Sequence, residues 1–489
     1  MNQRKLQEFQ TIFYPRSIAV VGASHDRWKF GTRYLQALID SRFKGRLYPI
    51  NSSTDEILGI KTYAKITSIP DSVDYVIVAI PARSVPDLLD DCADKGVKTV
   101  QIFTAGFSET GQDEGRRLEK VIEKKSRDGG FRIIGPNCIG VYSPAQRIPF
   151  GPMHFSVEAG PVGFISHSGG VAGNLIDDGI RRGVRFSKVV SFGNGCDLDD
   201  CDYLEYLAVD PDTGIVGAYL EGAKDSRRLF SLAKKISKIK PMIIWKGGRT
   251  PAGAETAASH SGSLAGSDII WKAALRQTGV VKVENHEELV DTILGFLHFS
   301  GFAGKRISVV AGLYGAGGGA SVASSDACTS LGLEVPPFTH ETKAKLAAIL
   351  PEAGSILRNP LDVGSIGANL EVLNMAIGLV LTDPLIDILM IQVPVDFLVG
   401  LGSKKIFRDT IETVVSFRKN QTKPIILISP YGSAVTERLE FERKLSHAGI
   451  PAYPTFERAA KTIVNLNQYY GFHGQQGMRI SSDTLRKIS

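Results

Sequence analysis

A histidine and a glutamate in the middle of the chain have the residue types needed to transfer a phosphoryl group. His260 lies in ETAASHSGSLAGSD, where Ser, Gly and Ala on both sides predict an accessible loop rather than a packed core. Imidazole is nucleophilic near neutral pH and can carry a phosphoryl group covalently. Glu221 ends the apolar run GIVGAYLEG, so its carboxylate could accept the Nδ1–H of a histidine and leave Nε2 free to attack. A helix cap or a surface ion pair is the alternative for Glu221.

A second feature that could bind phosphate is the segment ISHSGGVAGNLIDDGI. It places Ser168, Gly169 and Gly170 between an apolar strand and an expected helix. The first amides of a helix have no intrahelical acceptors and form the positive end of the helix dipole. Because such an end binds anions, we expect these residues to contact a phosphate or the charge that develops on it.

A glycine-containing loop after the first apolar strand indicates another phosphate site. Gly22, Ala23 and Ser24 follow SIAVV, and backbone amides at such a turn can contact phosphate. A dinucleotide fingerprint GxGxxG would require glycine at the positions of Ser24 and Arg27. The loop therefore suits a phosphate but does not predict an NAD site. A plain strand-to-helix turn is the alternative.

Further candidate residues follow the other strands of the same segment. They are Asn51, Pro81, Asn137 and Cys138. Ligands in open α/β sheets bind at the carboxyl ends of the strands. Any one of these residues could belong to an ordinary turn, but their recurrence at one edge of one sheet indicates a shared ligand site.

Strands of several sheets are expected to position these residues. Successive series of apolar runs along the chain predict those strands. Short β-branched runs alternate with helical stretches, which is typical of parallel sheets covered by helices. We predict an α/β protein with a Rossmann-like first domain. The expected segments are a first domain over residues 1–145, a second over 146–300, a third over 301–470 and a polar tail over 471–489.

The composition excludes several classes of function. Hydrophobic residues make up 43% and charged residues 22% of the 489 residues, as in globular proteins. The formal net charge of +6 comes without long single-sign runs, which argues against nucleic acid as a partner. No run has the length of a membrane span or a signal peptide, and the five widely spaced cysteines predict neither a zinc site nor a disulfide framework. We expect a cytoplasmic protein with no metal site and no membrane partner.

Longer segments of the chain resemble a known enzyme family. They are YPRSIAVVGAS, GRLYPIN, VAIPARSVPDLLDDCADKGVK, TAGFSETG, RIIGPNCIGVY, SFGNGCDLDDCDYLEYLAVDPDT, LEGAKDSRR, ETAASHSGSLAGSD and NPLDV. In this order they are similar to the NDP-forming acyl-CoA synthetases, in particular to alpha subunits of the ADP-forming acetate type, which are related to succinyl-CoA synthetase. The resemblance covers nearly the whole chain.

The resemblance implies a fold and a reaction. The Rossmann-like domain would bind CoA at the strand ends named above, and two succinyl-CoA synthetase-like, flavodoxin-like domains would follow. His260 would be phosphorylated transiently, with Glu221 supporting it. The reaction would interconvert acyl-CoA, ADP and phosphate with a carboxylic acid, ATP and CoA. No segment resembles an ATP-grasp fold, so ATP or ADP and Mg²⁺ would bind to a separate beta subunit.

Some positions depart from the pattern of the family. His167 stands where Gln is usual, Gly170 stands where Ala is common, and Trp28 lies in the proposed CoA loop. These three departures are expected to affect the rate of the reaction and the choice of acyl group. A CoA-binding regulatory or scaffold protein without turnover is the alternative function, and the presence of both His260 and Glu221 argues against it. The incomplete GxGxxG array disfavours an oxidoreductase.

Overall fold

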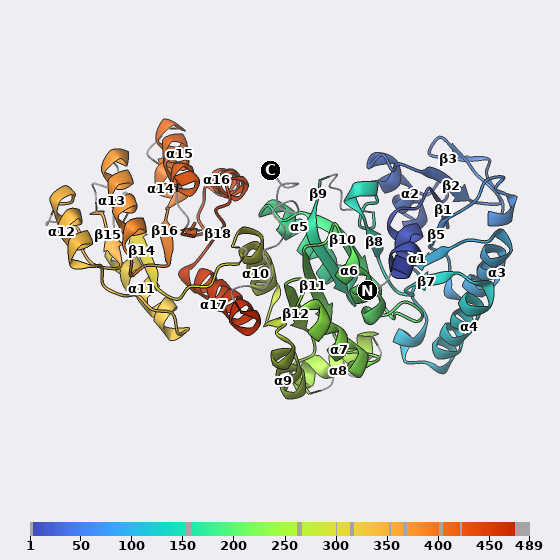
Figure 1. Ribbon diagram of the computed structural model, residues 1–489. Coiled ribbons are helices and arrows are strands. Elements are labelled where there is room, and N and C mark those ends of the chain that lie inside the picture. Colours follow the sequence, from blue (N-terminus) through green and yellow to red (C-terminus); the bar gives the residue numbers. More distant parts are fainter. Residues whose placement is uncertain are drawn as a thin grey trace. The chain divides into compact units, whose positions relative to one another are not determined.

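The computed structural model describes most of the chain as two compact units (Figure 1). The described residues are 3–152, 158–261, 267–299, 301–312, 317–351, 354–364, 369–400, 404–420 and 423–474. The first unit comprises the described residues up to 178 and residues 185–289, and the second comprises residues 179–184 and the described residues from 290. Strands and helices alternate in both units, so the predicted α/β class is confirmed.

The first sheet of the first unit has five parallel strands in the order β2-β1-β5-β6-β7. Their bounds are β1 Ser17–Val21, β2 Arg46–Ile50, β5 Tyr75–Val78, β6 Thr99–Ile102 and β7 Arg132–Ile134. The connections contain α2 (Phe30–Asp40), α3 (Val85–Lys95), α4 (Asp113–Gly129) and a hairpin of β3 (Glu56–Ile57) and β4 (Ile60–Lys61). β1 and β5 are buried along their whole length, as parallel strands covered on both faces must be.

The second sheet of the first unit has six strands in the order β13-β12-β11-β9-β10-β8. The strands are β8 Gly140–Tyr142, β9 Ala159–Ser166, β10 Phe186–Ser191, β11 Ile215–Leu220, β12 Met242–Lys246 and β13 Val281–Val283. The helices are α5 (Gly169–Arg181), α6 (Asp200–Val209), α7 (Ser226–Ile236), α8 (Pro251–Ser261) and α9 (Asp268–Thr278). The edge strand β8 runs antiparallel to β10, so the expectation of a purely parallel sheet is wrong at this edge. β8 has only three residues, which is too short for a strand to be recognised from its pattern of apolar residues.

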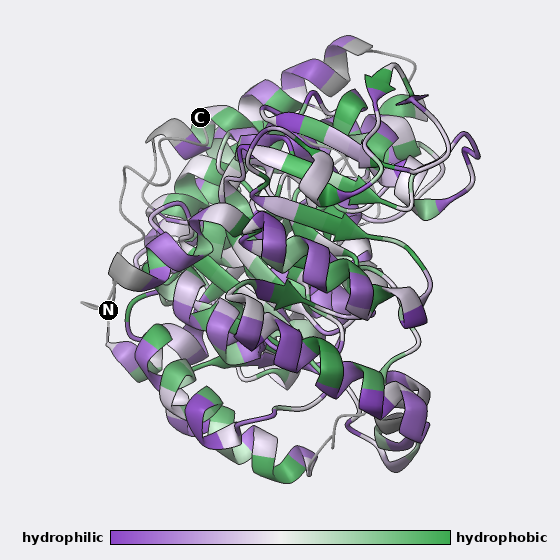
Figure 2. Cartoon of the chain, turned by 90° about the vertical axis from the view of Figure 1, so that its right-hand side faces the viewer, coloured by the Kyte–Doolittle hydropathy of each residue, from purple (hydrophilic) through white to green (hydrophobic). Residues whose placement is uncertain are grey.

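A continuous hydrophobic core includes residues of both sheets of the first unit. The N-terminal helix α1 (Gln3–Phe13) is part of it, because the rings of Phe9 and Phe13 stack on Tyr206 of α6 with centroids 4.9 and 4.7 Å apart. Aromatic pairs of this kind bury large apolar areas. Figure 2 shows strands that are mostly hydrophobic and helices with many hydrophilic residues. The two sheets are therefore packed as one body.

The second unit is built on a third sheet of parallel strands in the order β15-β14-β16-β17-β18. The strands are β14 Ile307–Ala311, β15 Leu361–Asp362, β16 Ile388–Gln392, β17 Ile425–Ile428 and β18 Ala452–Tyr453. The helices of the C-terminal half are α10 (His286–His298), α11 (Gly317–Ser330), α12 (His340–Ile349), α13 (Leu370–Thr382), α14 (Val395–Gly400), α15 (Lys404–Asn420), α16 (Val435–His447) and α17 (Phe456–His473). α17 extends past residue 471, into the segment predicted as a polar tail, and residues 475–489 lie outside the described residues. Among the helices that the structure describes, none is long and apolar enough to cross a bilayer.

Candidate functional site

The candidate phosphate site lies where the order of strands in the second sheet reverses. From the central strand β9 the chain moves to β10 on one side and then to β11 on the other. The carboxyl ends of β9 and β11 therefore flank a switch point, the place at which open α/β sheets bind ligands. The register pairs Ser166 with Tyr219, so the loops that follow these strands begin side by side.

The loop after β9 forms the start of α5, with free amides. The hydroxyl of the buried Ser166 donates to the carbonyl of Ser168 at 2.7 Å and accepts its amide at 3.0 Å. Ser168 Oγ in turn accepts an amide of the first turn at 3.3 Å. The amides of Gly169 and Gly170 belong to this turn, where no intrahelical acceptor exists. A Cβ at Gly169 would lie 2.3 Å from Ile139, whereas at Gly170 it would meet no atom closer than 3.9 Å. Packing therefore requires glycine only at the first of these positions.

Glu221 lies directly after β11, and its exposed fraction is only 6%. The Tyr219 hydroxyl donates to its Oε1 at 3.3 Å, and Lys246 Nζ donates to its carbonyl oxygen at 2.8 Å. Burial lowers the pKa of Lys246 to about 8, so its ammonium group is still mostly charged near neutral pH. Glu221 is therefore held by the neighbouring strand β12, with a positive charge beside it.

His167 lies at the same switch point and is a neutral imidazole. Its Nδ1 accepts the amide of Glu221 at 3.4 Å, and its ring lies 4.6 Å from the ring of Phe192. The accepting role of Nδ1 assigns the proton to Nε2. Burial, together with the nearby cations of Lys224 and Lys246, lowers the pKa of His167 to about 4. At neutral pH this histidine therefore adds no charge to the site.

Replacing His167 by glutamine is expected to make the folded state less sensitive to acid. The pKa of His167 is about 4 in the folded protein against 6.5 for a free histidine, so the unfolded chain binds a proton first. Protonation of the unfolded chain therefore lowers the free energy of unfolding as the pH falls from 6.5 toward 4. Relative to neutral pH, the loss is about 1 to 2 kcal/mol near pH 5. Urea unfolding of both proteins at neutral pH and near pH 5 measures the difference. If wild type and the glutamine variant lose the same free energy of unfolding between neutral pH and pH 5, His167 does not have a lowered pKa in the folded protein.

The prediction of a loop around His260 is wrong, because residues 251–261 form α8. Pro251 occupies the first helical position, and Thr250 Oγ1 accepts the amide of Gly253 at 3.1 Å. Proline at this position, a threonine cap and several alanines favour a helix, which outweighs the small-residue signal. α8 contacts the short helix η3 (Ser108–Thr110), which follows the first-sheet strand β6. The side chain of His260 lies outside the described residues, so its pairing with Glu221 stays a prediction.

A second candidate site lies at the strand ends of the first sheet. The chain moves from β1 to β2 on one side and to β5 on the other, so this sheet also has a switch point beside β1. Gly22 has a φ of +101°, and a Cβ there would lie 2.2 Å from the carbonyl oxygen of Ala79. A Cβ at Gly31 would lie 2.4 Å from the backbone of Gly22. Only glycine fits at these positions, which let β1, β5 and α2 approach one another closely.

Side-chain hydrogen bonds fix the loop that follows Gly22. Thr32 Oγ1 accepts the amide of Ser24 at 3.0 Å and donates to its carbonyl oxygen at 2.9 Å. Asn51, from the end of β2, donates through Nδ2 to the carbonyl oxygen of Ala23 at 2.9 Å. Gly22, Ala23, Ser24 and Asn51, which the sequence predicted as ligand residues, therefore lie together.

Pro81 and Asn137 lie after other strands of the same edge. Pro81 is exposed and precedes the short helix η2 (Ala82–Ser84). Asn137 is half-buried and has a φ of +57°, and its amide donates to the carbonyl oxygen of Thr104 at 3.0 Å. Asn137 is thus tied to the loop after β6. The edge offers backbone and amide groups rather than charged side chains at these positions.

The side chain of Cys138 points into the core, so the predicted ligand contact of this residue can involve only its backbone. Its exposed fraction is 4%, and Sγ lies 3.4 and 3.5 Å from the carbonyl oxygens of Ile102 and Ile134. Burial raises the pKa of this thiol far above its usual range. Only the backbone of Cys138 remains available to a ligand, because a small apolar side chain packs well between the strands.

Two family models match the chain. One, described as a CoA binding domain, matches residues 16–144, and the other, described as a succinyl-CoA ligase like flavodoxin domain, matches residues 159–296. The ADP-forming acetate–CoA ligase I subunit alpha of Pyrococcus furiosus is 36% identical over 94% of this chain and 97% of its own length. This chain belongs to the ADP-forming acetate–CoA ligase family.

Other members of the family agree in sequence and in fold. The ADP-forming acetate–CoA ligase of Methanocaldococcus jannaschii is 39% identical over 73% of this chain, which spans only 49% of that protein. The solved dinucleotide-forming acetyl-coenzyme A synthetase 1 of Ca. Korarchaeum cryptofilum, in complex with phosphate and ADP, is 30% identical, with a TM-score of 0.81 over 98% of both chains. The family and the α/β fold predicted from the sequence are thus confirmed: a CoA-binding domain is followed by a succinyl-CoA ligase-like flavodoxin domain.

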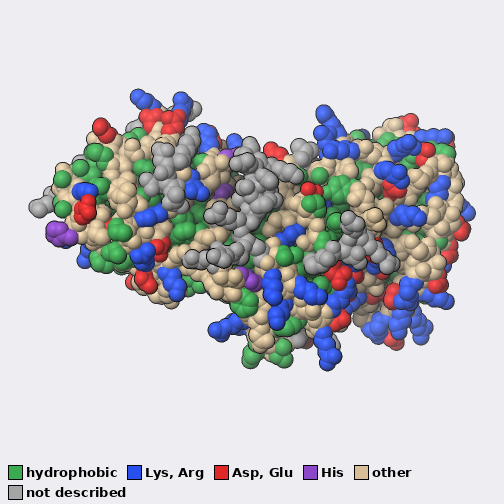
Figure 3. Space-filling view, in the orientation of Figure 1, with side chains coloured by type: hydrophobic (Ala, Val, Ile, Leu, Met, Phe, Trp, Pro, Cys, Tyr) green, Lys and Arg blue, Asp and Glu red, His purple; other side chains and the backbone are tan. Residues whose placement is uncertain are grey.

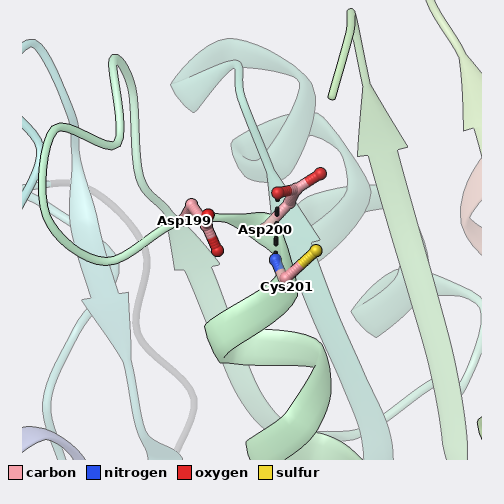
Figure 4. Close-up of side chains that lie close together, drawn as sticks. All are labelled: Asp199, Asp200 and Cys201. Carbon is pink, nitrogen blue, oxygen red and sulfur yellow. Dashed lines mark hydrogen bonds between the residues drawn. The ribbon is translucent and has the colours of Figure 1, made fainter. Parts of the chain in front are cut away.

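Among the described residues, a group of possible metal ligands lies at the start of α6. The ligand atoms of Asp199, Asp200 and Cys201 lie within 4.8 Å of one another, but Figure 4 shows the side chains pointing in different directions. Asp199 caps the helix by accepting the amide of Asp202 at 3.1 Å. Burial raises the pKa of Asp200 to about 7 and that of the Cys201 thiol above its usual range. A helix N-terminus also repels cations, so these residues do not fit a metal ion.

Two residues that the sequence analysis did not select, Glu109 and Asn194, connect loops that follow strands of the two sheets of the first unit. Glu109 Oε1 accepts the amide of Phe107 at 3.1 Å, and its Oε2 accepts from Asn194 Nδ2 at 2.6 Å. These bonds join the loop after β6 to the loop after β10. A carboxylate in the small-residue segment TAGFSETG and an amide directly after the strand SKVVSF were the available signals.

Proposed function

We propose that the chain is the alpha-type subunit of an ADP-forming acyl-CoA synthetase and that His260 carries the phosphoryl group. The observation that supports this most is the position of Glu221. Its buried carboxylate lies at the switch point of the second sheet, directly after the strand that neighbours β9, and β9 leads into α5. The helix that bears His260 follows the neighbouring strand β12. A non-catalytic CoA-binding protein would need neither residue.

The reaction proceeds by successive transfers. A phosphate oxygen attacks the carbonyl carbon of acyl-CoA, the C–S bond breaks, and CoA leaves as acyl phosphate forms. Nε2 of His260 then attacks the phosphorus, and the P–O bond to the acyl group breaks to release the carboxylate. An oxygen of the ADP β-phosphate finally takes the phosphoryl group from Nε2, which yields ATP and restores the histidine. Each transfer is reversible, so the same groups also make acyl-CoA from the acid, ATP and CoA.

The residues of the second sheet have distinct tasks in this proposal. The amides of Gly169 and Gly170 bind the phosphate oxygens at the start of α5, as helix ends do with anions. Glu221 accepts Nδ1–H of His260, which leaves Nε2 free to attack. The same carboxylate stabilises the positive charge that the imidazole gains when it is phosphorylated. No further base is needed, because the nucleophile is the neutral ring.

We also propose that CoA binds at the strand ends of the first sheet. The loop Gly22–Ser24 offers amides to the phosphates, Asn51 and Asn137 offer side-chain groups, and Pro81 and the backbone of Cys138 line the approach. The match of residues 16–144 to a CoA binding domain supports this. The substrates are CoA with a carboxylic acid, or the corresponding acyl-CoA. Relatives are named as acetate–CoA ligase, 4-hydroxybutyrate–CoA ligase and trans-feruloyl-CoA synthase, so acyl groups of different size occur among them.

A separate ATP-grasp beta subunit binds ADP or ATP together with Mg²⁺ in this proposal. Relatives named as alpha subunits support a partner chain. Mg²⁺ supplies neutralisation of the phosphate charges during transfer. We further propose the domain limits 1–145 for CoA binding, 146–300 for the phosphohistidine segment and 301–470 for the second flavodoxin-like segment, with a tail over 471–489. A cytoplasmic location is supported by the five free cysteines.

Reconstitution with an ATP-grasp partner tests the proposed function. The full chain is combined with the beta subunit of the same organism, and ATP formation from acyl-CoA, ADP and phosphate is measured for acetyl, branched and aryl substrates. We expect turnover with at least one substrate, and only when both chains are present. CoA binding to the chain alone is measured in parallel by calorimetry.

The contrasting outcome is equally definite. If the partner turns over with a known alpha subunit but never with this chain, and this chain still binds CoA, the protein is a CoA-binding regulatory or scaffold protein.

A further inference from the structure

Lys246, the last residue of β12, is a buried lysine of the first unit. Figure 3 shows Lys and Arg side chains that project into solvent over much of the visible surface, whereas the exposed fraction of Lys246 is only 1%. Removing an ammonium group from water costs free energy, so a lysine is seldom buried unless polar groups surround it. A buried lysine at the carboxyl end of a strand is therefore a candidate for a functional role.

The ammonium group of Lys246 connects two strand ends with a helix. Its Nζ donates to the carbonyl oxygen of Glu221 at 2.8 Å and to the carbonyl oxygen of Gly247. These acceptors belong to the residues that directly follow β11 and β12. Nζ also lies 5.3 Å from the centre of the ring of Trp271 on α9, and an aromatic face stabilises a buried cation. The ammonium group thus fixes the backbone of Glu221 relative to β12 and α9.

The contacts of Gly247 extend this arrangement to the carboxylate of Glu221. A Cβ on Gly247 would lie 2.5 Å from the hydroxyl oxygen of Tyr219, and this hydroxyl donates to Glu221 Oε1. The amide of Gly247 donates to the carbonyl oxygen of Leu220 at 2.9 Å. The end of β12 therefore determines where the backbone and the carboxylate of Glu221 lie.

The charged and titratable groups near Lys246 come from several elements. They are Glu221 after β11, Asp268 on α9, Lys282 on β13 and His167 after β9. Lys282 Nζ lies 3.2 Å from Asp268, so these two charges largely offset each other, and His167 is neutral near pH 7. Burial lowers the pKa of Lys246 to about 8, although the negative charges of Asp268 and Glu221 raise it. The ammonium group thus loses its proton within a pH range in which an enzyme can be assayed.

We propose that Lys246 is a positioning residue for the phosphohistidine reaction, because its ammonium group holds Glu221 in the orientation that accepts Nδ1–H of His260. This inference rests on the proposed function, in which Glu221 acts on His260. When Nζ loses its proton, it becomes a weaker donor to the two carbonyl groups, and the end of β11 is less well fixed. Phosphorylation of His260 should therefore slow as the pH rises through about 8.

The pH dependence of His260 phosphorylation tests the inference. The full chain is mixed with the beta subunit and labelled ATP, and the rate is measured by rapid quench from about pH 6.5 to about pH 9.5. The wild-type rate should fall about 10-fold, with a midpoint near pH 8. Lys246→Met, which has a side chain of similar length without the charge, should be about 10-fold slower than wild type near neutral pH and show no such fall. Its CoA affinity should stay within about twofold, which verifies that the variant is folded.

Lys240→Met is the matched control. Lys240 also donates to two backbone carbonyl groups, those of Leu207 and Asp210, both at 2.7 Å. Burial lowers the pKa of Lys240 to about 8 as well, but this lysine precedes β12 and so lies at the opposite end of the strand from Lys246. The control should keep both the rate and the pH dependence of wild type.

A double-mutant cycle shows whether Lys246 acts through Glu221. In a chain that already carries Glu221→Gln, Lys246→Met should slow phosphorylation by only about threefold or less. The inference is overturned if wild type shows no alkaline fall, if Lys246→Met keeps that fall, or if the effect of Lys246→Met is undiminished in the Glu221→Gln chain. Absence of label on His260 of the wild-type chain would instead overturn the proposed function and, with it, this inference.

Discussion

His260→Ala is expected to remove all acid-labile phosphate from the chain and to slow ATP formation from acyl-CoA, ADP and phosphate by at least ~10⁴-fold. The loss is large because the imidazole is the covalent carrier between the acyl phosphate and ADP. His167 cannot replace it, since its Nδ1 accepts the amide of Glu221 and its Nε2 carries the ring proton. CoA affinity should stay within about twofold, because the first sheet is not altered.

The measurement is intact mass and acid-labile label after incubation with labelled ATP and the beta subunit. His286→Gln is the matched control, because this histidine belongs to α10 and its Nε2 lies 3.4 Å from Asp178. The control should keep both label and turnover. Label that survives His260→Ala would move the phosphoryl carrier to another residue.

The strands of the three sheets could be predicted because parallel strands covered on both faces leave continuous apolar runs. SIAVV of β1 and IILI of β17 are buried throughout. The edge strands β8, β13, β15 and β18 could not be predicted, since strands of two or three residues carry no periodicity. The role of α1 was also beyond the sequence, because its rings find their partner Tyr206 far along the chain.

The sequence could predict which strand ends carry the candidate site residues, but it could not predict how their side chains are oriented. The rule that ligands bind at the carboxyl ends of parallel strands located Ser168, Glu221 and the loop after β1. It could not tell that the thiol of Cys138 turns into the core, because the neighbours of a side chain depend on strands that are distant in sequence. It also missed the helix around His260, where helix propensity and a threonine cap outweighed the small residues.

Glu221→Gln is expected to slow phosphorylation of His260 by about 10²-fold to 10³-fold. The amide has nearly the same shape and could still accept from Tyr219, which now donates at 3.3 Å. It lacks the negative charge that stabilises the imidazole as it gains a phosphoryl group, so the transition state rises in energy. Rapid-quench measurement of the phosphorylated chain gives the rate, and the level of phosphohistidine at equilibrium should fall as well.

Stability separates this role from a structural one. Glu221 is a buried carboxylate with an exposed fraction of 6%, and glutamine has nearly the same volume and can still accept from Tyr219, so the replacement leaves no cavity. The unfolding midpoint of Glu221→Gln should therefore stay close to that of wild type while phosphorylation slows. Glu288→Gln is the matched control, since this buried glutamate accepts the amide of Glu284 at 2.9 Å on α10. A rate for Glu221→Gln within about threefold of wild type would show that the carboxylate does not act on the histidine.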